Sequence, residues 1–192
     1  MRVIAGTAKG VRLYGPKSLK VRPILDRVKE SLFAVLSPHL EGARVLDLFA
    51  GVGSIGIEAL SRGAKQVDFI ELDRGTADFI KANLERAGLA ENGRVVIGRL
   101  PAALKRVSGE YSLIFVDPPF RIGGRLMEEL FRVLSGKGLL GQGGLLVYRH
   151  SPRLVHEPSP PLCLSERRDY GDSIVSIYSA FGESDDDGAG GR

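Results

Sequence analysis

Residues 117–120 of the sequence read Asp-Pro-Pro-Phe and directly follow an apolar run at positions 113–116. A continuous apolar run is typical of a strand buried on both faces, and it delivers the Asp117 carboxylate to the carboxyl end of that strand. Pro118 and Pro119 fix their own φ angles and stiffen the loop that follows. An acid, a rigid carbonyl and an aromatic ring in this order suit the binding of a planar exocyclic amine.

The chemistry that this loop favours is methylation of such an amine. Its lone pair is delocalised into the ring, which makes it a poor nucleophile. We expect the Asp117 carboxylate and the Pro118 carbonyl to accept its N–H groups and to direct the lone pair at an activated methyl carbon. Phe120 would stack on the ring, which is worth about 1–3 kcal/mol. The predicted catalytic residues, acting through positioning and preorganised charge, are Asp117, Pro118, Pro119 and Phe120.

A second motif, at residues 47–56, reads Asp-Leu-Phe-Ala-Gly-Val-Gly-Ser-Ile-Gly. Gly51, Gly53 and Gly56 form a G-x-G-x-x-G pattern between a predicted strand and a predicted helix, which lets the backbone approach a ligand closely. Glu71 ends the next strand, where its carboxylate can accept hydrogen bonds from ribose hydroxyls. The pattern predicts a nucleoside-type cofactor and leaves a dinucleotide and S-adenosylmethionine both open.

Asp47 favours S-adenosylmethionine over a dinucleotide. Dinucleotide loops offer the N–H groups of a helix N-terminus to a pyrophosphate anion, which a nearby carboxylate would repel. S-adenosylmethionine has no phosphate and carries a sulfonium and an ammonium, which an acid attracts. The predicted cofactor-binding residues are Asp47, Phe49, Gly51, Gly53, Gly56, Glu71, Leu72, Arg99 and Leu100.

Strands that alternate with amphipathic helices from residue 43 onward must position both motifs. We predict strands at 44–49, 66–71, 94–97, 111–117 and 144–149, and helices at 54–62, 74–87, 100–107 and 125–134. Two more strands, at 163–170 and 173–181, form a terminal hairpin with one strand antiparallel at the sheet edge. The predicted fold is α/β, a doubly wound Rossmann-like sheet whose ligand site lies at the carboxyl ends of its strands.

The two ends of the chain differ from this central pattern. Residues 1–20 alternate short β-type pieces with glycines, which predicts a small basic hairpin. The predicted methyltransferase domain spans residues 21–182 and begins with a helix over 22–37. Residues 183–192 are rich in acids and glycine and predict a disordered tail.

The net charge of +4 is unevenly distributed, because residues 1–30 hold eight basic side chains against two acidic ones. Such a block is either a solvated face or a surface that contacts phosphates. Cys163 is the only cysteine, and the three histidines lack metal-ligand spacing, so neither a disulfide framework nor a metal site is expected. No apolar run approaches the roughly 18 residues that span a bilayer, and no signal-peptide core is present. We expect a cytoplasmic monomer without membrane or metal partners.

The chain resembles the RsmD-type bacterial enzymes, which methylate N2 of a guanine in 16S ribosomal RNA. The segments that carry the resemblance are Ile4-Ala-Gly6, Arg22-Pro23, 26–33, 45–51, 58–64, 69–71, 117–120 and 170–172. The resemblance implies S-adenosylmethionine as cofactor and small-subunit ribosomal RNA, free or in an assembling particle, as partner. It also implies that the N-terminal hairpin and helix hold RNA, with Arg2, Lys9, Arg12, Lys17, Lys20, Arg22 and Arg27 as contacts.

Three positions depart from the pattern of related methyltransferases. Phe120 stands where the family usually has tyrosine, Ile24 stands where it usually has threonine, and Arg99 bears on the cofactor. Gly98-Arg99 stands where related methyltransferases often place Gly-Asp, and an arginine cannot accept a hydrogen bond from the adenine amino group. We therefore expect adenine to be held by backbone groups near Arg99 and Leu100 and by apolar packing.

Three other functions compete with this interpretation. A nicotinamide-dependent oxidoreductase would use the same glycine loop, and a non-catalytic RNA-binding module would keep the same fold. A methyltransferase acting on adenine N6 or cytosine N4 of DNA would carry the same tetrapeptide, so only the family resemblance points to guanine N2.

Overall fold

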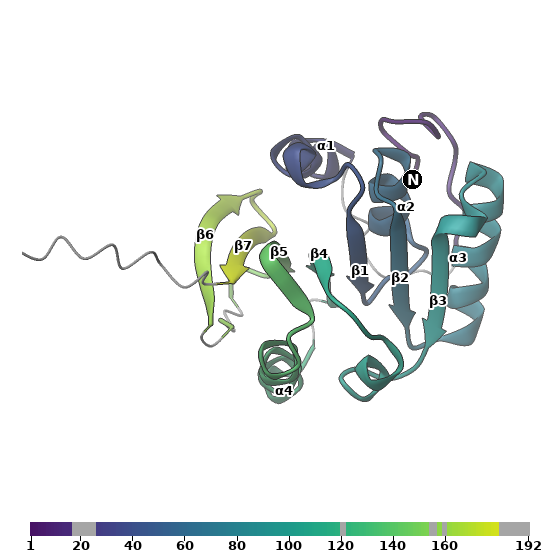
Figure 1. Cartoon of the computed structure of the whole chain (residues 1–192). Helices are drawn as coiled ribbons and strands as arrows, with labels where there is room; N and C mark the ends of the chain where they lie inside the picture. Colours follow the sequence, from purple (N-terminus) through teal and green to yellow (C-terminus); the bar gives the residue numbers. More distant parts are fainter. Residues whose placement is uncertain (17–25, 120–121, 154–156, 159–160, 181–192) are drawn as a thin grey trace, which may run out of the picture.

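The computed structural model describes residues 1–16, 26–119, 122–153, 157–158 and 161–180 (Figure 1). Seven strands form one sheet in the order β3-β2-β1-β4-β5-β7-β6. The strands are β1 (Arg44–Leu48), β2 (Gln66–Glu71), β3 (Gly93–Ile97), β4 (Tyr111–Val116), β5 (Leu140–His150), β6 (Leu162–Asp169) and β7 (Ile174–Ala180). The helices are α1 (Asp26–Val35), α2 (Ser54–Ser61), α3 (Arg74–Ala87) and α4 (Gly124–Gly136), with 3₁₀ turns η1 (Ser37–His39), η2 (Ala90–Asn92) and η3 (Ala102–Arg106).

The first five strands run parallel, and the chain order reverses between β1 and β4. Helices that leave these two strands turn to opposite faces of the sheet, which opens a crevice at the carboxyl ends of β1 and β4. Both predicted motifs directly follow these strands, so the topology brings Gly51 and Asp117 to the same crevice. The α/β Rossmann-like prediction is confirmed.

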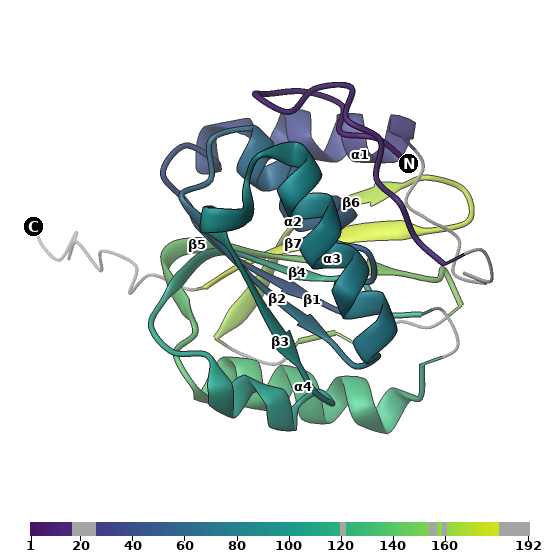
Figure 2. The ribbon, with the colours of Figure 1, turned by 90° about the vertical axis from the view of Figure 1, so that its right-hand side faces the viewer.

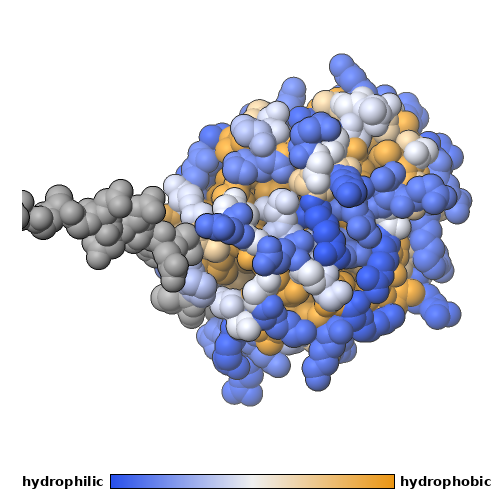
Figure 3. Space-filling view, in the orientation of Figure 1, coloured by the Kyte–Doolittle hydropathy of each residue, from blue (hydrophilic) through white to orange (hydrophobic). Residues whose placement is uncertain are grey.

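Helices cover both faces of the sheet, with α1, α2 and α3 on one face and α4 on the other (Figure 2). Two apolar cores correspond to these two layers. One contains Phe33, Ile57 and Ile80 from the three helices, and the other contains Leu130 from α4 and Leu104 from η3. On the face drawn in Figure 3, the apolar surface of the described residues is broken into small areas between hydrophilic side chains.

Several element boundaries differ from the sequence-based predictions. The helix predicted at 100–107 is the short 3₁₀ turn η3, which begins after Pro101 and ends where the backbone becomes extended at Val107. β5 begins at Leu140, earlier than predicted, and α1 is described from Asp26 onward. The strand that opposes the others is β7, which lies between β5 and β6 and not at the edge as expected. The tail at 183–192 lies outside the described residues.

Residues 1–16 lie on the side of the sheet that α1, α2 and α3 cover (Figures 1 and 2). The predicted hairpin is reduced to one antiparallel bridge, between Arg2 and Arg12, supported by a hydrogen bond from Val3 N–H to Val11 C=O. The segment gains its order from contacts with the helices, since a two-stranded ribbon alone is only marginally stable in water.

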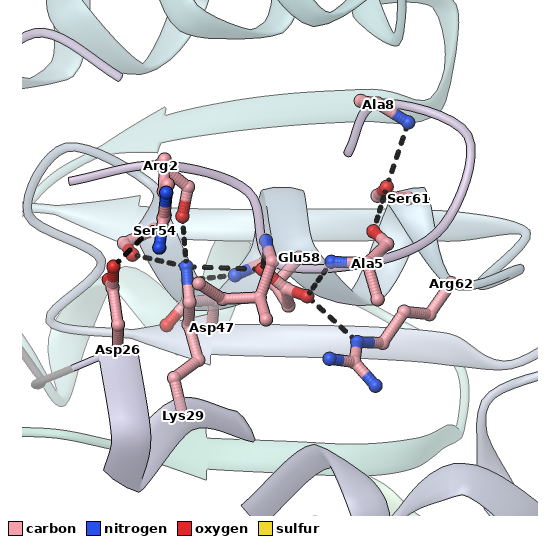
Figure 4. Close-up of polar contacts among 12 residues, drawn as sticks. Arg2, Ala5, Ala8, Asp26, Lys29, Asp47, Ser54, Glu58, Ser61 and Arg62 are labelled. Atoms are coloured by element: carbon pink, nitrogen blue, oxygen red, sulfur yellow. Dashed lines mark hydrogen bonds and ion pairs between the residues drawn. The ribbon is translucent and has the colours of Figure 1, made fainter. Parts of the chain in front are cut away.

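A buried ion-pair cluster attaches this segment to the domain (Figure 4). The Glu58 carboxylate of α2 accepts hydrogen bonds from Ile4 N–H (2.8 Å) and Ala5 N–H (3.0 Å). Lys29 Nζ lies 3.1 Å and Arg62 Nε 2.8 Å from the same carboxylate, whose side chain is fully buried. Lys29 was one of the eight charges of the basic block, yet its side chain is buried inside the protein.

Candidate active site

A cavity of about 290 Å³ lies where the carboxyl ends of the parallel strands meet. Segments that follow four neighbouring strands contribute to its wall, together with the start of α4. The lining residues are Phe49, Gly51, Ile70, Glu71, Leu72, Gly98, Arg99, Leu100, Asp117, Pro119, Ile122 and Leu126. Its position matches the crevice that the strand order predicts.

The cavity brings together most of the residues predicted from the two motifs. Among the described residues, Phe49, Gly51, Glu71, Leu72, Arg99, Leu100, Asp117 and Pro119 line it, whereas Asp47, Gly53, Gly56 and Pro118 do not. Phe120 lies outside the described residues. The sequence analysis missed Ile70, Gly98, Ile122 and Leu126. Ile70 and Gly98 could have been found because they adjoin predicted residues. Ile122 and Leu126 could have been found from their apolar character and helical spacing.

The Glu71 carboxylate fastens the glycine loop to the end of β2. It accepts hydrogen bonds from Gly51 N–H (2.8 Å), Leu72 N–H (2.8 Å) and Asp73 N–H (2.9 Å). A carboxylate has about four acceptor positions, so one remains for a donor that enters the cavity. Glu71 therefore both shapes the loop and offers a charged acceptor to a ligand.

The loop after β1 has a backbone that few residues tolerate. Phe49 has φ = 61°, which makes it the one non-glycine residue with a positive φ in the described part of the chain. Such strain persists only where the surroundings enforce it, and it concentrates at functional sites. At Gly56 an added Cβ would lie 2.2 Å from Phe69 Cε1, so helix α2 can pack against β2 only without a side chain there. The third glycine of the pattern thus serves packing.

The Asp47 side chain, on β1, binds the first turn of helix α2. Its carboxylate accepts a hydrogen bond from Gly56 N–H at 2.9 Å, and its side chain is buried. Burial raises the pKa of Asp47 to about 8, the Gly56 hydrogen bond lowers it, and the nearby Asp117 and Glu71 carboxylates raise it further. Asp47 is thus a buried acid at the start of helix α2, and its expected attraction for the cofactor's cations stays a prediction.

Asp117 is held by an arginine that the sequence analysis did not single out. Arg149 Nε donates to Asp117 Oδ1 at 2.7 Å, and Arg149 Nη2 donates to Asp117 Oδ2 at 3.0 Å. Both side chains are largely buried, with exposed fractions of 11% and 15%. Burial raises the pKa of Asp117, and the charge and hydrogen bonds of Arg149 offset part of that rise.

The described members of the predicted RNA-binding set lie at the surface. Lys9, Arg12 and Arg27 are exposed, and exposed Arg2 pairs with Asp26 at 3.2 Å. Lys17, Lys20 and Arg22 lie outside the described residues.

Asn83 of α3 links the basic segment to the glycine loop. Its side chain bonds both backbone groups of Tyr14, at 2.8 and 2.9 Å, and its Nδ2 also donates to Val52 C=O at 3.0 Å. One side chain therefore holds the end of the basic segment and the loop beside the cavity together.

Comparisons with known proteins show the family of this chain. The family described as Conserved hypothetical protein 95 matches residues 1–179. Ribosomal RNA small subunit methyltransferase D of Escherichia coli K12 is 38% identical over 191 residues, which cover 97% of this chain and 94% of the relative. The chain belongs to the RsmD family.

Solved structures extend the comparison to the fold. A hypothetical protein of Thermus thermophilus shares 31% identity with this RsmD-family chain, with a TM-score of 0.79 over 94% of this chain and 99% of the other. An RNA methyltransferase of Salinibacter ruber, solved with S-adenosyl-L-homocysteine, has a TM-score of 0.67 over 86% and 98% of the two chains. At 17% identity, that second likeness shows the shared fold alone.

The described residues include neither a membrane-spanning helix nor a metal-binding cluster. No helix among them has the length and apolar character to cross a bilayer. No group of three or more His, Cys, Asp or Glu side chains in this part of the chain is arranged to hold a metal ion.

Proposed function

We propose that this RsmD-family protein transfers the methyl group of S-adenosylmethionine to the exocyclic N2 amine of a guanine in 16S ribosomal RNA. The observation that carries the proposal is one shared cavity, which is lined both by Gly51 and Glu71 and by Asp117 and Pro119. A nucleoside cofactor and a base amine can meet only where both sets of residues face the same space.

The lining suits S-adenosylmethionine. Glu71 offers an acceptor to the ribose hydroxyls, and Gly51 lets the backbone approach the ligand. Ile70, Leu72 and Leu100 supply apolar surface for the adenine ring. The cofactor supplies an activated methyl group, whose carbon–sulfur bond breaks with its electron pair moving to sulfur.

The residues of the loop after β4 orient the amine. The Asp117 carboxylate accepts one N–H of the amine, which turns the nitrogen lone pair toward the methyl carbon. That the Pro118 carbonyl accepts the other N–H stays a prediction, because Pro118 is not among the residues that line the cavity. When the nitrogen–carbon bond forms, the nitrogen holds one proton too many, and the Asp117 carboxylate is the acceptor at hand. The stacking role of Phe120 stays a prediction.

The choice of ribosomal RNA and of guanine N2 rests on the family. A relative that covers nearly the whole chain is named Ribosomal RNA small subunit methyltransferase D. A guanine in folded RNA must leave its stack to reach Asp117, which costs a few kcal/mol. Contacts between the basic N-terminal segment and phosphates offset that cost. We further propose that the protein works in the cytoplasm as a monomer.

The cofactor assignment predicts the effect of Glu71→Ala. This variant should bind S-adenosylhomocysteine about 10–100-fold more weakly, because a charge-assisted hydrogen bond is worth about 1.5–3 kcal/mol and the Gly51 loop loses its anchor. Isothermal calorimetry measures the change, with the exposed Glu85→Gln variant of α3 as control. NAD should bind to none of these proteins. Tight NAD binding would favour the oxidoreductase alternative.

The RNA surface predicts a salt effect. Affinity for RNA should fall steeply with salt, and the double variant Lys9→Gln/Arg12→Gln should reduce the slope of log K against log[salt] by about 1.4–1.8, the value for two lost phosphate contacts. The variant Lys105→Gln/Arg132→Gln removes the same charge from the α4 side and should leave the slope unchanged. An equal effect of both variants would place the RNA surface elsewhere.

Methyl transfer itself tests the proposed function. The purified protein is incubated with S-adenosylmethionine labelled in its methyl group and with 16S ribosomal RNA, both naked and in small-subunit particles. Label should enter the RNA of at least one substrate and should not enter DNA. Label in DNA alone would support the DNA alternative, and no label in any substrate would support a non-catalytic module.

A further inference from the structure

We propose that Arg149 is a positioning residue of this active site, which keeps the Asp117 carboxylate ionised and fixes the plane in which it lies. The inference deepens the proposed function and rests on it for its kinetic consequences. The pairing itself is a property of the protein alone and can be tested without RNA or cofactor.

The sheet register sets up the pair. β4 and β5 run parallel, with Val116 opposite Tyr148, so Asp117 and Arg149 are the next residues along their two strands. On the other side, Asp117 N–H still bonds Leu48 C=O of β1, at 3.4 Å. Asp117 therefore leaves its strand between two neighbours, and one of these places a guanidinium beside the carboxylate.

The geometry of the contact is that of a fork. Two donors of one planar guanidinium reach the two oxygens of one carboxylate, at 2.7 and 3.0 Å. Such a bidentate pair fixes orientation as well as distance, which a lysine ammonium cannot do. The two bonds use two of about four acceptor positions on the carboxylate, so the other two remain for the N–H group of an amine.

The burial of Asp117 gives this arginine its importance. Burial removes water from the Asp117 carboxylate, which favours the protonated acid, and the charge and hydrogen bonds of Arg149 oppose that effect. Asp47 on β1 and Glu71 at the end of β2 are further acids near the same strand ends. Arg149 on β5 is the cation that faces Asp117 in the described structure, and its charge cannot be titrated away. A protonated Asp117 would lose its capacity to take up the amine's proton.

The direct test is a carboxyl titration of the whole protein. Aspartate carbons labelled with ¹³C are followed by NMR across the pH range, and the Asp117 signal is assigned by its loss in Asp117→Asn. In Arg149→Met the pKa of Asp117 should rise by about 1–3 units, the effect of removing an adjacent opposite charge. The matched control is Arg132→Met, which replaces an exposed arginine of α4 and should leave the Asp117 titration unchanged.

The kinetic test follows the same variants. The acidic limb of the pH profile of kcat/KM should move to higher pH by a similar amount in Arg149→Met, with activity recovered at alkaline pH. Arg149→Lys retains the positive charge but not the bidentate geometry. The acidic limb of its kcat/KM profile should therefore stay near that of the wild type, while the plateau value of kcat/KM falls. If Arg149→Met does not fold, Arg149→Lys tests the role of Arg149 instead: a lower plateau with an unshifted acidic limb supports that role.

The outcomes separate the two proposals. An unchanged Asp117 titration in Arg149→Met, or a loss of rate that is equal at every pH, overturns the role of Arg149. A wild-type protein that methylates no RNA overturns the proposed function, while the titration still decides whether Arg149 holds the charge of Asp117.

Discussion

Asp117→Ala is expected to lower kcat for methyl transfer to ribosomal RNA about 10²–10³-fold, the usual cost of removing one preorganised polar group from a transition state. The variant loses the acceptor that orients the amine and takes its proton. The contacts proposed for the cofactor come from Glu71 and Gly51 and not from Asp117, so binding of S-adenosylhomocysteine should change little.

Single-turnover kinetics and calorimetry on the same preparation separate these two effects. The exposed Asp78→Asn variant of α3 serves as the control for a lost aspartate. Turnover near the wild-type rate in Asp117→Ala would show that Asp117 does not act on the amine. Loss of cofactor binding in proportion to activity would make Asp117 a general determinant of the cavity's structure.

Glu58→Ala is expected to reduce the free energy of unfolding by about 3–5 kcal/mol, because it breaks a buried ion pair by removing one partner. Lys29 loses the carboxylate partner of its ion pair, and the N–H groups of Ile4 and Ala5 lose their acceptor. Residues 1–16 should then detach from α2, and hydrogen exchange at the amides of Ile4 and Ala5 should accelerate strongly.

Denaturant unfolding measures the loss of stability, with Glu85→Ala on the exposed face of α3 as control. The double variant Lys29→Met/Glu58→Leu replaces the pair by apolar groups and should recover much of the stability. A change below about 0.5 kcal/mol in Glu58→Ala would show that the cluster contributes little, as surface substitutions do.

Local sequence patterns were sufficient where one segment determines its own structure. The predicted bounds of β2 and α3 coincide with the observed ones, because apolar runs and helical spacing are properties of consecutive residues. Strand–turn sequences also place Gly51 and Asp117 at strand ends, and the parallel topology then brings them to one crevice.

Contacts between distant residues could not be predicted in the same way. The Asp117–Arg149 pair joins positions 32 residues apart, and only the register of β4 and β5 brings them together. Lys29 sits in a stretch whose charge suggested solvent, yet Glu58, Ser54 and the Arg2 carbonyl surround its ammonium. The position of β7 between β5 and β6 depends on which strands pair with each other, and the sequence of a single strand does not predict its partners.

Identification of the methylated nucleoside tests the central claim most directly. Small-subunit ribosomal RNA treated with the purified protein and S-adenosylmethionine is digested to nucleosides and analysed by mass spectrometry against synthetic standards. The account predicts that N2-methylguanosine appears with the wild-type protein and falls by at least about a hundredfold with Asp117→Ala. A product methylated at a ring carbon, at a ribose oxygen or at another base's amine would contradict it.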